Sequence, residues 1–245
     1  MLNEQTMTKL HAMKLHGLAD GYTEQRQQPQ MADLPFDERF GMLVDRQWRW
    51  REERVLTTRL RNAKFKLQAC VEDIDYQATR GLKRAQIDQL YSSEWIGYHQ
   101  NVILTGSTGT GKTFLACALG QKACRDGYRV RYYVAAKLFR ELTHSHADGS
   151  FMGLSSKLLK TDLLLIDDWG METLKESEYR DFLEVLDDRQ GSGATLITSQ
   201  FPTKLWHDTI GNPTLADAIL DRLVHNAHRI ELKGETLRKP RGQSG

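Results

Sequence analysis

The chain has 245 residues, of which 40% are hydrophobic and 27% charged, and its formal net charge is +2 at pH 7. This length and apolar fraction allow one α/β domain with a well-packed core plus a small additional segment, and they exclude an intrinsically disordered chain. The first residues do not form a secretory leader, and no apolar run approaches the roughly 20 residues that span a bilayer. Three cysteines without a Cys-x-x-Cys pair indicate reduced thiols, so we expect a cytoplasmic protein that does not bind membranes.

Residues 1–67 are expected to form a small all-α N-terminal domain that binds DNA, a partner protein or both. Two segments carry apolar residues at helical spacing, and a polar break at residues 25–31 separates them. The apolar positions are Leu15, Leu18, Ala19 and Tyr22 in the first segment and Phe36, Phe40, Leu43 and Val44 in the second. Residues 68–100 then form a linker with one short helix near residues 84–90.

Residues 101–245 are expected to form an α/β domain with a five-stranded parallel sheet flanked by helices. Apolar runs alternate there with helical patterns, which is typical of a parallel sheet covered on both faces. The predicted strands are residues 101–105, 129–134, 162–167, 194–199 and 227–232, and the predicted helices are residues 112–126, 136–143, 152–160, 175–190 and 214–225.

A glycine-rich loop follows the first of these strands. Residues 106–113 match the pattern G-x-x-x-x-G-K-[ST] between a strand and a helix, where backbone N–H groups can turn onto phosphate oxygens. Lys112 would reach the β and γ phosphates, and the Thr113 hydroxyl would bind Mg²⁺. The sequence therefore predicts a site for ATP and Mg²⁺ whose nucleotide-binding residues are Gly106, Ser107, Thr108, Gly109, Thr110, Gly111, Lys112, Thr113 and Phe114.

Two carboxylates follow the third strand. The apolar residues 163–166 lead directly into Asp167 and Asp168, as expected where a strand ends beside bound Mg²⁺. Asp167 would hold the metal through water, and Asp168 would orient and polarise the water that attacks the γ-phosphate. Paired acids can also form a solvated turn, but the preceding phosphate loop favours the catalytic interpretation.

Two more residues are candidates for the catalytic site. The strand at residues 194–199 ends in hydroxyls and can lie between the loop strand and the aspartate strand, which would bring Ser199, or as a second choice Thr198, to the attacking water or the γ-phosphate; such hydroxyls also form ordinary turns. Arg222 ends a helix and can protrude toward the γ-phosphate held by a neighbouring subunit. An arginine–aspartate pair at the surface is the alternative for Arg222.

In combination, these residues resemble AAA+ ATPases of the initiator and helicase-loader group, and most closely the IstB-like transposition helper ATPases encoded beside insertion-sequence transposases. The resemblance runs through most of the chain. The segments that carry it are residues 81–82, 95–96, 104–106, 115–120, 165–170, 221–223 and 229–238.

The resemblance implies a AAA+ P-loop ATPase that assembles as a ring or filament on duplex DNA and recruits and stimulates a partner transposase. It assigns the Walker A role to Lys112 and Thr113, the Walker B role to Asp167 and Asp168, and the arginine finger to Arg222. Arg238 matches the position of a second sensor arginine. Asp168 departs from the glutamate usual in AAA+ enzymes, and its shorter side chain implies slow turnover.

Basic residues indicate where DNA would bind. Residues 46–66 carry eight Lys or Arg against two Glu, with two tryptophans among them, and such a stripe can neutralise phosphates or form a solvated helix face. The resemblance adds basic residues around the second strand. Because phosphate contacts carry no base sequence, we expect little sequence specificity on duplex DNA. The candidate contacts are Arg59, Arg61, Lys64, Lys66, Arg131, Lys137 and Arg140.

Three other functions remain open at this point. A DnaC-like replicative helicase loader shares nearly every motif and would differ in the partner of its N-terminal domain. A P-loop small-molecule kinase also needs Lys112 and Asp167, but would carry a substrate lid and would not need Arg222 from another subunit. A scaffold that does not hydrolyse ATP would use the nucleotide only to hold subunits together.

Overall fold

The computed structural model describes residues 2–76, 81–234 and 236. Its contacts divide the chain into two compact units, Met1–Thr58 and Arg59–Gly245. This division falls earlier than the boundary at residue 67 that the sequence suggested. The reason is that the residues just after the division pack within the second unit, where the Phe65 ring lies against Gly120.

The first unit is all-α. It contains helices α1 (Leu2–Ala12) and α2 (His16–Gln27), the short 3-10 helix η1 (Pro29–Asp33) and most of the long helix α3 (Phe36–Ala63). Helices α2 and α3 are in contact. The side chain of Gln47 in α3 accepts a hydrogen bond of 3.1 Å from the backbone N–H of Leu18 in α2. The apolar pattern of α3 is only partly buried, since Leu43 is covered whereas Phe36 and Phe40 are exposed.

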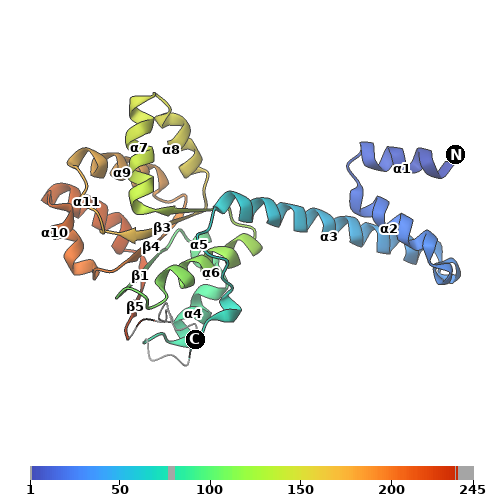
Figure 1. Ribbon diagram of the computed structural model, residues 1–245, viewed down its shortest axis with the longest axis horizontal. Helices are drawn as coiled ribbons and strands as arrows, with labels where there is room; N and C mark the ends of the chain where they lie inside the picture. The colour runs from blue at the N-terminus through green and yellow to red at the C-terminus, as the bar shows by residue number, and fades with distance from the viewer. Residues whose placement is uncertain (1, 77–80, 235, 237–245) are drawn as a thin grey trace, which may run out of the picture. The chain divides into compact units, whose positions relative to one another are not determined.

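A five-stranded parallel sheet forms the centre of the second unit (Figure 1). Its order is β2-β3-β4-β1-β5, so β4 lies between the loop strand β1 and the aspartate strand β3, as the sequence led us to expect. The five predicted strands are therefore confirmed, each within two residues of its expected bounds. They are β1 (Asn101–Gly106), β2 (Val130–Val134), β3 (Leu163–Trp169), β4 (Ala194–Ser199) and β5 (Ala227–Leu232).

Helices cover both faces of this sheet (Figure 1). One face packs against α6, and α4 lies beside α6; the other face carries α7, α8, α9, α10 and α11. None of the helices within the described ranges is long and apolar enough to cross a membrane. The bounds are α4 (Arg84–Tyr91), α5 (Glu94–Gly97), α6 (Lys112–Arg125), α7 (Ala135–Ala147), α8 (Phe151–Leu159), α9 (Glu176–Arg189), α10 (Trp206–Ile210) and α11 (Pro213–Val224), with short 3-10 helices at Val71–Asp73 and Thr203–Leu205.

Alternation along the strands separates two apolar layers. Ile103, Leu164 and Ile197 face the layer formed with α7 to α11. On the opposite side, Cys117 and Cys124 of α6 are fully buried, which confirms the expected inward face of that helix. Burial raises the pKa of the Cys124 thiol to about 12, so it behaves as a small apolar side chain at neutral pH.

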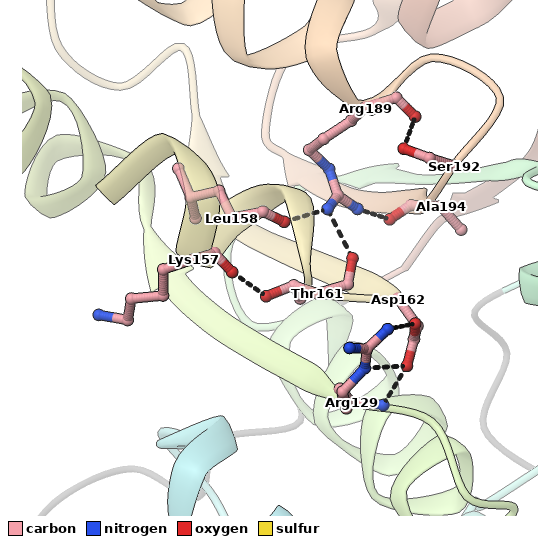
Figure 2. Close-up of polar contacts among 8 residues, drawn as sticks. All are labelled: Arg129, Lys157, Leu158, Thr161, Asp162, Arg189, Ser192 and Ala194. Atoms are coloured by element: carbon pink, nitrogen blue, oxygen red, sulfur yellow. Dashed lines mark hydrogen bonds and ion pairs between the residues drawn. The ribbon is translucent and has the colours of Figure 1, made fainter. Parts of the chain in front are cut away.

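A buried arginine ties three elements together at the amino-terminal end of the sheet (Figure 2). The Arg189 guanidinium donates to the carbonyl oxygens of Leu158 and Thr161, both at 2.6 Å, and to that of Ala194 at 2.7 Å. Burial lowers the pKa of Arg189 to about 10, which still leaves it charged at neutral pH. Arg189 therefore fixes the end of α8 and the starts of β3 and β4 relative to one another.

Candidate ATP site and basic cavity

The phosphate loop connects β1 to α6 and requires glycine at two close approaches. Gly106 has φ +144°, and a β-carbon there would lie 2.1 Å from the carbonyl oxygen of Leu232. Gly109 has φ +87°, and a β-carbon there would lie 2.0 Å from the hydroxyl of Thr236. Any larger residue would push the loop off β5 and the segment that follows it, so these glycines set the loop conformation.

Lys112 is folded over this loop. Its ammonium is buried and donates to the backbone oxygens of Gly106 at 2.7 Å and Ser107 at 2.9 Å. The charge is thus held at the amino-terminal end of α6, where phosphate groups are favoured by the helix dipole and by backbone N–H groups.

Asp167 lies at the carboxyl end of β3 and is only 1% exposed. Its carboxylate accepts hydrogen bonds from three hydroxyls, those of Tyr132 at 2.6 Å, Thr198 at 2.5 Å and Thr113 at 3.0 Å. These donors come from β2, β4 and α6, so the sheet order itself builds the site. Burial, followed by the hydrogen bond to Asp167, raises the pKa of Tyr132 well above its ordinary value and keeps the phenol a donor.

Asp168 occupies a strained backbone position. Successive side chains of a strand point to opposite faces, yet the register of β3 shifts here and Asp168 has φ +61°, a left-handed value unusual for aspartate. Its N–H donates to the Thr198 hydroxyl at 3.1 Å. This irregularity lets both carboxylates face the same ammonium group, that of Lys66, at 3.4 Å from Asp167 and 3.6 Å from Asp168.

The oxygen donors fit a magnesium ion. The Thr113 hydroxyl and the Asp167 carboxylate are hard ligands of the kind that Mg²⁺ prefers, and a cationic group, the Lys66 ammonium, already lies against the carboxylates. Beside them is a cavity of about 510 Å³. Its lining combines the phosphate loop and Asp168 with Val134 of β2, Phe139 of α7, Met171 in the turn after β3, and Gln200 directly after β4.

The hydroxyl that reaches the acidic pair belongs to Thr198. The Ser199 hydroxyl instead donates to the backbone oxygen of Trp169 at 2.9 Å and accepts from the Phe201 N–H at 3.1 Å. These contacts favour Thr198, the second choice from the sequence, over Ser199. Strand alternation explains the difference, because neighbouring residues of β4 point to opposite faces.

Arg222 lies at the other end of the sheet. The side chain of Asn101, the first residue of β1, donates to the backbone oxygen of Arg222 at 2.8 Å, and the Arg222 guanidinium pairs with Asp187. The length of β1 places this end roughly 17 Å from the phosphate loop at ~3.3 Å per residue. Lys112, Asp167 and Asp168, which the sequence also predicted to be catalytic, are brought together at the opposite end.

The predicted DNA contacts divide into three groups. Lys66 is exposed and pairs with Asp167 and Asp168. Arg61, Lys64, Lys137 and Arg140 are exposed. Arg59 and Arg131 line a cavity of about 420 Å³ with Arg129, Lys157 and Lys160, which the sequence did not single out as a group.

Arg129 is fixed at the edge of this cavity by a bidentate pair with Asp162 (Figure 2). Within the described residues, Arg59, Arg131 and Lys160 have no ion pair within 4 Å. Burial and the nearby charge of Arg131 lower the pKa of Lys157, as expected where cations are held together.

A family model described as IstB-like ATP binding protein matches residues 8–244. The chain belongs to this family. A putative insertion sequence ATP-binding protein of Sinorhizobium fredii is 48% identical over 239 residues, with 98% of both chains covered. The IS1162 putative ATP-binding protein of Pseudomonas fluorescens is 43% identical, with 83% of this chain and 88% of that protein covered.

Solved structures agree on the fold. The IstB-like chain matches the crystal structure of DnaI with a TM-score of 0.55 at 22% identity, covering 68% of this chain and 92% of that one. It matches AMPPCP-bound DnaA from Aquifex aeolicus with a TM-score of 0.56 at 19% identity, covering 69% and 51%. The AAA+ fold expected from the sequence is therefore confirmed, and this IstB-like protein is an ATP-binding ATPase of insertion-sequence type.

Sequence reasoning missed Tyr132 and the position of Lys66. Tyr132 lies in a predicted strand, but only the adjacency of β2 and β3 brings it to Asp167. Lys66 lies 101 residues from Asp167 in the chain and looked like one of many basic residues. Neither carries a signal in spacing alone.

Proposed function

We propose that this protein is a cytoplasmic, ATP-dependent transposition helper that assembles on duplex DNA, hydrolyses ATP with Mg²⁺, and recruits and stimulates a partner transposase at its target. The family supports the ATPase and its insertion-sequence context. The observation that carries the proposal further is the separation of Arg222 from the phosphate loop.

Arg222 supports a site completed by a second copy. It lies at the amino-terminal end of β1, held through Asn101, while Lys112 and Asp167 lie at the carboxyl-terminal end. An arginine on that edge does not reach the nucleotide of its own subunit. It is available to a nucleotide bound by a neighbour, where a guanidinium would stabilise the charge that develops on the transferred phosphoryl group. This arrangement supports a ring or filament of identical subunits.

The basic cavity supports DNA binding. Arg59, Arg131, Lys157 and Lys160 gather four basic side chains around a hollow, of which Lys157 is paired with Glu141, and none of the described residues that line the hollow is acidic. Such a site suits a phosphate of the DNA backbone, which would also offset the repulsion among these cations. Lys137 and Arg140 on α7 are exposed and provide further candidate contacts. Binding through phosphates predicts strong salt dependence and little base preference.

The decisive experiment measures ATP hydrolysis with and without duplex DNA over a range of protein concentrations, together with particle size. We expect turnover to rise cooperatively with concentration and with DNA, in step with the appearance of large particles. Hydrolysis that is independent of both would favour a small-molecule kinase and contradict the proposal.

The partner is tested separately. The full chain is immobilised and offered either the transposase encoded beside it or a replicative helicase, each in the presence of ATP and DNA. We expect retention of the transposase. Retention of the helicase alone would favour a helicase loader instead.

The DNA contacts are tested by the salt dependence of duplex binding. Replacing Lys64 or Lys137 with glutamine is expected to reduce the slope of log affinity against log salt by about one for each lost phosphate contact. Arg131→Gln tests the cavity in the same way, and Lys83→Gln is a control outside both groups. Slopes that stay unchanged in all three test variants would exclude these residues as contacts.

A further inference from the structure

Lys66 joins the ATP site from outside the motifs that define it. Its ammonium lies 3.4 Å from Oδ2 of Asp167 and 3.6 Å from Oδ2 of Asp168, although Lys66 comes from the segment just after α3. One of these carboxylates is buried and the other is about one-third exposed. The lysine therefore neutralises a pair of like charges where the site has to accept a metal and a triphosphate.

The backbone on both sides of Lys66 is held in place by packing and hydrogen bonds, which positions its ammonium beside Asp167 and Asp168. Lys64 takes a left-handed conformation with φ +57°, which ends α3 and turns the chain. The Phe65 ring then packs on α6 so tightly that a β-carbon on Gly120 would lie 2.6 Å from it. On the other side, the backbone oxygen of Leu67 accepts from the Gln121 side chain at 3.2 Å. Anchors on both sides hold Lys66 at the carboxyl edge of β3.

The side chain of Lys66 nevertheless has room to move. It is 46% exposed, and its flexible four-carbon stem lets the ammonium swing while the backbone stays in place. A divalent cation held at Thr113 and Asp167 would replace the Lys66 ammonium as the positive charge beside the carboxylates, and it would repel that ammonium. The nearest strong acceptor for the displaced charge is then the γ-phosphate, because Leu67, the next residue, lines the same cavity as the phosphate loop.

We propose that Lys66 binds the γ-phosphate: it pairs with Asp167 and Asp168 before the nucleotide enters, and turns to the terminal phosphate when Mg²⁺ and ATP occupy the site. The inference rests on the ATPase function and deepens it by naming a residue that distinguishes ATP from ADP. ADP lacks the acceptor, so it gains nothing from Lys66. The lysine would thus make the site respond to which nucleotide is bound.

Nucleotide affinity provides the test. The dissociation constants of ATP and ADP are measured by calorimetry on the full chain with Mg²⁺ and without DNA. Lys66→Met is expected to weaken ATP binding about tenfold or more while ADP binding changes less than about twofold, as for loss of one hydrogen bond between charged groups. Lys66→Arg, which keeps the charge, is expected to retain most of the preference for ATP.

Lys83→Met is the matched control, because it removes the same charge from an exposed residue of the second unit that does not line the ATP cavity. It should leave both affinities unchanged. Equal weakening of ATP and ADP by Lys66→Met, or no weakening of either, would overturn the proposal. Lys66→Gln repeats the measurement if the methionine variant does not fold. A wild-type chain that binds neither nucleotide would instead overturn the ATPase function itself.

Discussion

The Tyr132 phenol donates a 2.6 Å hydrogen bond to Oδ2 of Asp167, at a place where both groups are buried. The tyrosine comes from β2 and the aspartate from β3, so the bond joins neighbouring strands at the carboxyl edge of the sheet. Together with the Thr198 and Thr113 hydroxyls, it fixes the orientation of the carboxylate before any metal arrives. Preorganisation of this kind is what a metal-dependent ATPase requires of its acidic residue.

Tyr132→Phe is therefore expected to reduce ATP hydrolysis several-fold and to raise the Mg²⁺ concentration at half-maximal rate, because one of three hydroxyl donors is lost. The loss of a single hydrogen bond should also lower the free energy of unfolding by about 1 kcal/mol. Magnesium titration of the ATPase rate measures the first effect, and urea unfolding measures the second. Tyr133→Phe on the same strand is the control, and equal effects of both substitutions would contradict the proposed role of Tyr132.

The sequence was sufficient for the sheet and the phosphate loop, because these depend on local patterns. Apolar runs marked the central strands, whereas β5 carries His228, Arg229 and Glu231 among its apolar residues, and the spacing from Gly106 to Thr113 marked the loop. The sequence was insufficient where the outcome depends on strand neighbours or on which face a side chain takes. Ser199 and Thr198 are adjacent hydroxyls at a strand end, and only the pairing of β4 with β3 shows that Thr198 reaches Asp167.

Charge patterns were similarly ambiguous. Eight basic residues in one stretch suggested DNA contacts as a group, yet Lys66 turns to the carboxylates while Arg59 lines a separate cavity. The left-handed turn at Lys64 ends α3 and directs Lys66 away from Arg59. The amino-acid composition of the stretch does not predict this turn. Arg238 lies outside the described residues, so its role as a second sensor stays a prediction.

Two substitutions separate hydrolysis from ATP-dependent assembly. Lys112→Ala removes the ammonium held over the phosphate loop and should weaken ATP binding at least tenfold. Asp168→Asn keeps the side-chain size but loses the charge that polarises water, so it should bind ATP and assemble on DNA while hydrolysing about 100-fold more slowly. Calorimetry, particle sizing and phosphate release give the three readouts. Normal stimulation of the transposase by Asp168→Asn would instead support a scaffold that does not need hydrolysis.

Arg189 is expected to be among the most important polar residues for stability. Arg189→Leu removes the donor from three buried carbonyl oxygens, which should lower the free energy of unfolding by about 3 to 5 kcal/mol. Arg180→Leu is the control on the same helix, because its pair with Glu176 is exposed and should contribute less than about 1 kcal/mol. Urea unfolding of both variants checks the difference. Similar unfolding midpoints for the two variants would contradict the proposal that Arg189 holds α8, β3 and β4 together.

Stability should fall in alkaline solution. The pKa of Cys124 is raised by burial to about 12 in the folded chain, against an ordinary value of 9.0 for a thiol, so the folded state holds this proton more tightly than the unfolded state. The stabilisation is complete below about pH 9 and is lost as the pH rises toward 12, at no more than about 1.4 kcal/mol per pH unit for one proton. Cys117 and Tyr132, whose pKa values are also raised by burial, add to the same trend. Unfolding between pH 8 and pH 10.5 should show a shallower decline in Cys124→Ala, and an identical decline would contradict the assignment.

Arg222 yields the sharpest test of a site shared between subunits. If Arg222 acts as an arginine finger, Arg222→Ala alone should bind ATP normally and lose at least about 100-fold in turnover. Lys112→Ala alone should also be inactive, because its phosphate loop is impaired. When the two variants are mixed, one kind of interface combines an intact loop from the Arg222 variant with an intact Arg222 from the Lys112 variant.

Mixing should therefore restore a measurable part of the ATPase rate, with a maximum near equal proportions. If Arg222 acted within its own subunit, every site in the mixture would still lack one of the two groups and no activity would return. Asp187→Asn is a useful companion, because it releases Arg222 from its intrasubunit pair without removing the guanidinium. Its turnover should stay near that of the wild type, which separates the loss of the finger from the loss of the surface pair.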